Sequence, residues 1–130
     1  MKKILSFLSL ALVALTFVSC NSNSPEAVVQ EYVADLQAGK YEEALDLFYF
    51  RKELTDKDKQ QYISMMTEKW GKEIDKKGGI TGVDITDVAV AEDGNTATVN
   101  YTLKYGDGST KDQNTSLVKV DDKWKIDAGK

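Results

Sequence analysis

Side chains that could carry chemistry are few in this sequence of 130 residues. It contains no histidine, which excludes Ser-His-Asp and Cys-His catalytic sets and histidine-containing zinc sites. The one cysteine, Cys20, has no second thiol in the chain with which to form a disulfide. Aromatic side chains remain. Tyr101 and Tyr105 share one face of an alternating segment, where their hydroxyls could hydrogen-bond a ligand, and Trp70 could line the same pocket.

These three aromatic residues have two interpretations. An aromatic side chain at helical or alternating spacing is usually part of a core, and the same spacing also suits the wall of a pocket. We take Trp70, Tyr101 and Tyr105 as candidate ligand-binding residues, in a pocket between the longest predicted helix and the concave face of the predicted sheet. No positioned base is identified beside them, so no catalytic residue is assigned and an enzyme is the less favoured class.

Neither a metal site nor a cofactor is predicted. Two acidic segments, residues 92–95 and 107–112, lack the alternating oxygen ligands and terminal glutamate of an EF-hand loop. Their glycine, asparagine and aspartate residues suit hairpin turns instead. Arg51, the one arginine in the chain, could clamp an acidic ligand or form a salt bridge at a helix end.

The first residues have the pattern of a secretory signal. Lys2 and Lys3 precede an apolar run over residues 4–18, and a polar segment follows over residues 21–24. A spanning helix needs about 20 apolar residues, which is more than this run supplies. The residues Phe17-Val18-Ser19-Cys20 resemble the lipobox of bacterial lipoproteins. This resemblance implies a signal peptide over residues 1–19, a lipidated Cys20, and a linker that extends to residue 24.

The expected mature chain is acidic. Once Lys2 and Lys3 leave with the signal, 15 basic residues remain against 21 acidic ones, a formal charge of −6. Nucleic acid is therefore not an expected partner, because binding to it depends on lysine and arginine contacts with phosphates. Anionic lipid headgroups would also repel the domain. The lipid anchor on Cys20 would thus be what holds the protein at a membrane.

Helices are expected in the first half of the domain. Ser24 and Pro25 suit the start of a helix, and Gly39 suits its end. A second, shorter helix follows Lys40, with Tyr41, Ala44, Leu45 and Phe48 on one face. A capping box at Thr55 starts the third and longest helix, whose apolar positions keep helical spacing: Tyr62, Ile63, Met66, Trp70 and Ile74.

Strands are expected after Gly78 and Gly79, where the hydrophobic period changes to two. Residues 96–105 alternate strictly between apolar and polar side chains. Residues 83–91 form a strand in which a bulge near residues 86–87 would keep four aliphatic side chains inward: Val83, Ile85, Val88 and Val90. Two more strands over residues 115–120 and 123–128 are joined at residues 121–122. Residues 25–130 therefore form a single α+β domain, with three N-terminal helices packed on a curved four-stranded antiparallel sheet.

Several segments of this domain are similar to a known group of proteins. The segments are residues 27–32, the helix junction at 39–44, the hairpin segment at 94–99 and the closing residues 117–126. They resemble the small bacterial lipoproteins of unknown function in the nuclear-transport-factor-2-like superfamily (SnoaL-like or cystatin-like, formerly lumazine-binding-like). The resemblance implies a cone-shaped domain whose open end can form a pocket. Some relatives are isomerases, dehydratases or cyclases that place an Asp, His or Tyr inside the cone, and others are binding or assembly domains.

Three functions are consistent with these observations. We favour a membrane-tethered lipoprotein of the bacterial cell envelope that acts as a non-catalytic binding or interaction module, on the periplasmic or cell-surface side. The alternatives are an accessory subunit of an envelope assembly and a small enzyme of the isomerase or hydro-lyase type. The expected partner is a small molecule or an envelope protein. The outer sheet face is polar, so we expect a mainly monomeric domain.

Overall fold

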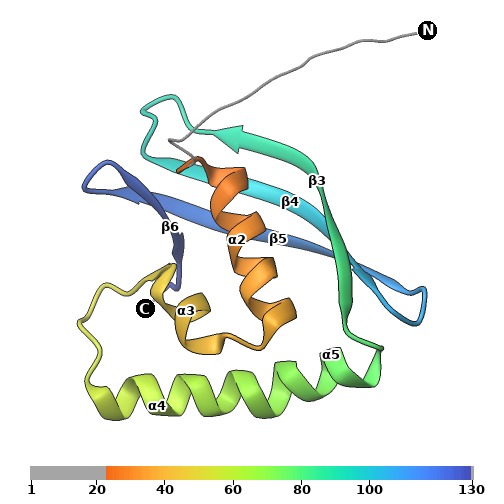
Figure 1. Cartoon of the computed structure of the whole chain (residues 1–130). Coiled ribbons are helices and arrows are strands. Elements are labelled where there is room, and N and C mark those ends of the chain that lie inside the picture. Colours follow the sequence, from red (N-terminus) through yellow and green to blue (C-terminus); the bar gives the residue numbers. More distant parts are fainter. Residues whose placement is uncertain (1–22, 130) are drawn as a thin grey trace, which may run out of the picture.

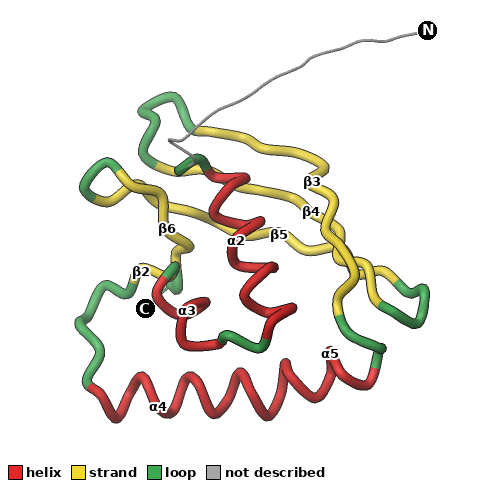
Figure 2. Tube along the Cα trace, viewed as in Figure 1, coloured by secondary structure: helices red, strands yellow, loops and turns green. Residues whose placement is uncertain are grey.

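The computed structural model describes residues 23–129 (Figure 1). The expected signal peptide over residues 1–19, Cys20 and residues 21–22 of the expected linker lie outside the described residues. In the described part of the chain, helices lie on one side of a five-stranded sheet (Figure 2). Helix α2 (Pro25–Ala38) lies against the sheet, and the long helical segment that includes α4 and α5 runs below it. The predicted α+β class is confirmed.

Helix α2 begins and ends where the sequence predicts. The Ser24 hydroxyl accepts a hydrogen bond from the Ala27 backbone N–H at 3.2 Å, and Pro25 occupies the first turn. At the other end Gly39 has φ 73°, a left-handed conformation that a glycine adopts without steric cost. The inward face of α2 carries four buried aliphatic residues: Val28, Val29, Val33 and Leu36. Helix α3 (Tyr41–Asp46) follows after Lys40.

The longest helix begins with the predicted capping box. The Thr55 hydroxyl accepts from the Asp58 N–H at 3.1 Å, and the Asp58 carboxylate accepts from the Thr55 N–H at 3.2 Å. The helix then contains three segments: α4 (Asp56–Met65), a π-helical segment η1 (Met66–Gly71), and α5 (Lys72–Lys76). Helical spacing did not indicate the π segment. Such segments often occur at functional sites, and this one carries Trp70.

Strand β4 (Thr96–Tyr105) has the predicted alternation, with buried residues at every second position: Ala97, Val99, Tyr101, Leu103 and Tyr105. It pairs with β3 (Ile80–Val90), and the register passes from Ile85↔Tyr101 to Asp87↔Asn100. Thr86 is therefore the extra residue of the predicted bulge. The bulge brings three of the four expected aliphatic side chains against the core. The fourth, Val90, lies at the end of this edge strand and is 52% exposed.

The sheet differs from the predicted one by a fifth, parallel strand. Over residues 23–129 the strand order is β2-β6-β5-β4-β3, in which β2 (Phe48–Tyr49) pairs parallel with β6 (Lys123–Asp127). The Leu47 carbonyl accepts from the Ile126 N–H at 2.8 Å, and the Tyr49 carbonyl from Ala128 at 3.1 Å. The prediction of four antiparallel strands was wrong because two residues are too few to show an alternation. Phe48 accordingly belongs to a strand and not to the second helix.

Strand β5 (Thr110–Val120) is longer than expected and begins five residues earlier. It joins β6 through Asp121 and Asp122, which both have positive φ, as a two-residue hairpin turn requires. The buried residues of all elements form one cluster, which includes Leu117, Trp124 and Ile126 as predicted. No helix in the described part of the chain is long and apolar enough to cross a membrane.

Candidate functional site

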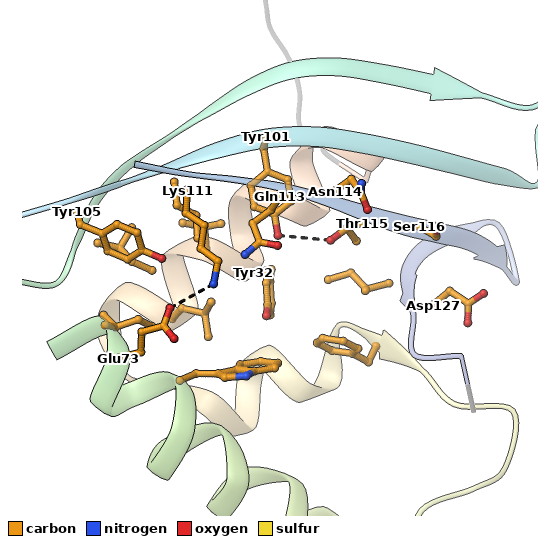
Figure 3. Close-up of a pocket in the computed structure, with 18 residues that line it drawn as sticks. Tyr32, Glu73, Tyr101, Tyr105, Lys111, Gln113, Asn114, Thr115, Ser116 and Asp127 are labelled. Carbon is orange, nitrogen blue, oxygen red and sulfur yellow. Dashed lines mark hydrogen bonds and ion pairs between the residues drawn. The ribbon is translucent and has the colours of Figure 1, made fainter. Parts of the chain in front are cut away.

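A cavity of about 580 Å³ lies between the long helix and the concave face of the sheet. Its walls include all three residues singled out from the sequence (Figure 3). Trp70 comes from the π segment η1, and Tyr101 and Tyr105 come from β4. The structure thus brings Trp70, Tyr101 and Tyr105 together, although they are up to 35 positions apart. Their role in binding a ligand stays a prediction.

The tyrosine hydroxyls of the cavity come from two elements that face each other. Tyr32 on α2 lies opposite Tyr101 and Tyr105, and Figure 3 shows the three hydroxyls directed towards the cavity. The Tyr101 hydroxyl lies 3.4 Å from the Thr115 hydroxyl. Burial raises the pKa of all three tyrosines above the ordinary value, because the phenolate is poorly solvated there. Each tyrosine is therefore a neutral O–H group at physiological pH.

One wall of the cavity is polar and comes from β5. Gln113 and Lys111 are paired with Tyr101 and Leu103 of β4, so their side chains lie on the inner face of the sheet. Thr115 continues the same face. Sequence reasoning missed these three residues because inward polar side chains resemble a solvent-exposed strand. Counting back by twos from the buried Leu117 would have identified them.

Two ion pairs border the cavity. The Lys111 ammonium lies 3.2 Å from the Glu73 carboxylate and joins β5 to α5 (Figure 3). The Arg51 guanidinium lies 3.6 Å from the Asp127 carboxylate. Of the two roles considered for Arg51, the structure shows a salt bridge, formed to β6 and not at a helix end. These pairs bring opposite charges together at the edges of the cavity.

The remaining walls of the cavity are apolar. Val33 and Leu36 of α2, Ile74 of α5 and Leu103 of β4 contribute aliphatic surface, and Phe48 packs edge-on against Tyr32 with ring centroids 5.6 Å apart. A concave space that combines apolar walls with convergent polar groups is typical of small-molecule sites. Over residues 23–129, no group of three or more Asp, Glu, Cys or His residues could hold a metal ion.

The acidic segments of the sequence form turns, as predicted. In the β3–β4 hairpin the Asp93 carboxylate accepts from the Asn95 N–H at 2.9 Å, and Gly94 has φ 72°. In the β4–β5 hairpin the Asp107 carboxylate accepts from the Ser109 N–H at 2.8 Å. Hydrogen bonds from the Ser109 hydroxyl and then from its backbone N–H lower the pKa of Asp107 below its ordinary value. Both carboxylates are thus used to stabilise hairpin loops.

Two solved structures are similar to this fold. One, described as an NTF2-like transpeptidase from Campylobacter jejuni, has a TM-score of 0.66 and 17% identity over 80% of this chain and 97% of its own. The other, a SEC-C motif containing protein from Rhodopseudomonas palustris, has a TM-score of 0.54 and 15% identity over 82% of this chain and 77% of its own. At these identities the likeness shows the fold alone, which is NTF2-like.

Sequence comparison identifies the family. No curated protein matches the chain. The family described as Domain of unknown function (DUF4878) matches residues 18–127, which include every helix and strand of the described fold. The chain therefore belongs to the DUF4878 family, a domain of unknown function, and its fold is NTF2-like.

Proposed function

We propose that this protein is a lipoprotein of the bacterial cell envelope that binds a small molecule in the cavity between the long helix and the sheet, without converting it. The observation that carries the proposal is the cavity itself, in which apolar side chains from the helices and β4 face polar side chains from β5. A space of about 580 Å³ is within the range of small-molecule sites, about 300–1,000 Å³.

The tether is supported by the chain before the domain. Cys20 follows the apolar run at the place where a lipobox cysteine stands. Two residues separate it from Asn23, whose side-chain oxygen accepts a hydrogen bond from the Trp124 N–H at 2.6 Å. The folded domain thus begins almost at the proposed anchor. Two or three acyl chains would hold it stably, whereas a single chain gives marginal binding.

Binding without catalysis is supported by the state of the cavity carboxylates. A general base must be free to reach a substrate proton. Glu73 and Asp127 are the two carboxylates on the cavity wall in the described part of the chain, and each is engaged by a cation. The tyrosine hydroxyls have raised pKa values, so they serve as hydrogen-bond donors and not as bases.

The anchor is tested by metabolic labelling with a radioactive fatty acid. Label should enter the wild-type chain and the control variant Ser22→Ala, which keeps the cysteine, and should be absent from Cys20→Ser. Fractionation should place the wild type with the membranes and Cys20→Ser with the soluble envelope proteins. Equal labelling of Cys20→Ser and wild type would overturn the anchor.

The binding site is tested by recovering the ligand. The protein is purified from native membranes and denatured, and the small molecules released are identified by mass spectrometry. Gln113→Trp places an indole in the cavity and should lose the bound molecule, whereas Thr98→Trp, on the outer face of β4, should keep it. Recovery of a stoichiometric envelope protein and no small molecule would overturn the proposal in favour of an accessory subunit.

A further inference from the structure

Several polar groups of the cavity can donate hydrogen bonds. Three tyrosine hydroxyls and the Gln113 amide point into the space from α2, β4 and β5 (Figure 3). The Tyr101 hydroxyl has a neighbour in Thr115 at 3.4 Å. The Tyr32 and Tyr105 hydroxyls and the Gln113 amide form no hydrogen bond with any residue in 23–129. Within residues 23–129, the one buried side-chain polar atom without a partner is Asp35 Oδ2, so these cavity groups are reached by solvent and can exchange water for an acceptor on a bound molecule.

The charged side chains on the cavity wall are paired within the protein, and Glu73 is shared by Lys111 and Lys77, at 3.2 and 4.0 Å. Among the cavity residues that the structure describes, Lys111 is the one basic side chain, and it is paired with Glu73. A ligand carboxylate would have to displace Glu73 from Lys111 and would then lie beside a second negative charge. Asp127 is paired with Arg51, so a cationic ligand would have to compete with the guanidinium. Removing the hydration of either kind of ion is unfavourable without a free partner of opposite charge.

We propose that the cavity takes an uncharged, largely apolar molecule that carries an oxygen acceptor such as a carbonyl, bound by the Tyr32 and Tyr105 hydroxyls and the Gln113 amide. The apolar body would lie against Trp70 and the aliphatic residues of α2 and α5. This inference rests on the proposed binding function and adds the chemical class of the ligand. Burial of Tyr32 and Tyr105 supports this ligand class, because both hydroxyls keep their protons throughout the physiological pH range.

Three probes of nearly equal shape test the ligand class. These are 2-acetylnaphthalene, which is neutral with a carbonyl acceptor, 2-isopropylnaphthalene, which has no acceptor, and 2-naphthoate, which is anionic. Each is titrated into ¹⁵N-labelled residues 21–130, which include every helix and strand of the described fold, and the amide shifts give both the dissociation constant and the place of binding. The ketone should perturb the cavity strands and bind at least tenfold more tightly than either of the other two probes.

Matched variants separate the hydroxyl contribution from shape. Tyr32→Phe and Tyr105→Phe should each weaken ketone binding about three- to tenfold, the change expected for one lost hydrogen bond, and leave 2-isopropylnaphthalene unchanged. Tyr62→Phe is the control, because this half-buried tyrosine lies outside the cavity and packs against Phe50.

The outcomes distinguish this inference from the proposal on which it rests. Equal binding of the ketone and 2-isopropylnaphthalene, or tighter binding of 2-naphthoate, would overturn the ligand class while the cavity remained a binding site. Failure of all three probes to perturb the cavity would overturn the binding function as well. Loss of ketone binding that is equal in Tyr62→Phe and Tyr105→Phe would overturn the assignment of the donors.

Discussion

Tyr105 belongs to the core and to the cavity wall at once, and this dual position gives a quantitative prediction. The residue is 5% exposed, and the Lys77 ammonium lies 4.8 Å from the centre of its ring. Its hydroxyl faces the cavity without a hydrogen-bond partner in residues 23–129 (Figure 3). We therefore expect the ring to determine stability and the hydroxyl to contribute little to it. Two substitutions, Tyr105→Ala and Tyr105→Phe, separate these parts.

The expected cost of Tyr105→Ala follows from the buried area. A buried tyrosine covers about 150–250 Å², of which roughly 120 Å² is lost on truncation to alanine. At about 25 cal/mol per Å², this loss costs about 3 kcal/mol, and the cation–π contact with Lys77 adds about 0.5–1 kcal/mol. The total, about 3–4 kcal/mol, is within the range measured for aromatic-to-alanine changes in cores. Tyr105→Phe keeps the ring and should cost less than about 1 kcal/mol.

Urea unfolding of residues 21–130, followed by tryptophan fluorescence and circular dichroism, measures both changes. Tyr105→Ala should lower the unfolding free energy by about 3–4 kcal/mol, and Tyr105→Phe should leave the midpoint nearly unchanged. A loss below about 1 kcal/mol in Tyr105→Ala would refute the placement of the ring in the core. A loss in Tyr105→Phe equal to that in Tyr105→Ala would refute the claim that the hydroxyl has no partner.

Three further predictions address the turn beside the cavity, pH and assembly. Gly106→Ala should lower the unfolding free energy measured in urea by about 2–3 kcal/mol, because the new Cβ would collide with the Gly78 carbonyl oxygen. Gly82→Ala is the control: this position has space for a Cβ, so the unfolding free energy should change by less than about 1 kcal/mol. Burial raises the pKa of Tyr32 in the folded state, so its contribution to stability is fully present below about pH 10, the unfolded pKa, and is lost as pH rises through the folded pKa. The urea midpoint should therefore fall above about pH 10, and less steeply in Tyr32→Phe. Sedimentation of residues 21–130 should give a monomer at micromolar concentration, and a tight dimer there would contradict the expectation from the polar outer face.

Much of the fold could be predicted because its signals are local. The caps at Ser24 and Thr55 are hydrogen bonds over three residues, so the residue types alone indicate them. Strand β4 lies between two neighbours with one face covered, which enforces strict alternation. The bulge at Thr86 was predictable because the aliphatic positions of β3 change parity there.

The features that were missed depend on distant parts of the chain. Strand β2 consists of Phe48 and Tyr49, and its two backbone hydrogen bonds to β6 span nearly 80 positions of sequence. The first half of β5 has inward Lys111 and Gln113, which alternate with the outward Asp112 and Asn114. Since both faces are polar, hydrophobic alternation is absent, and the segment has no strand signal of the ordinary kind.

The choice between a pocket and a core depends on the same long-range arrangement. Tyr101 and Tyr105 lie two pleats apart on one face of β4. This spacing suits a core and a pocket wall equally, so it cannot decide between a core and a pocket. The deciding residues are Tyr32, which enters from a helix about 70 positions earlier, and Gln113, which enters from the next strand. A core that is closed leaves no reason for three phenol groups and an amide to meet, because each buried donor without an acceptor is unfavourable. Their convergence around an open space is therefore the strongest structural argument that this end of the domain receives a ligand.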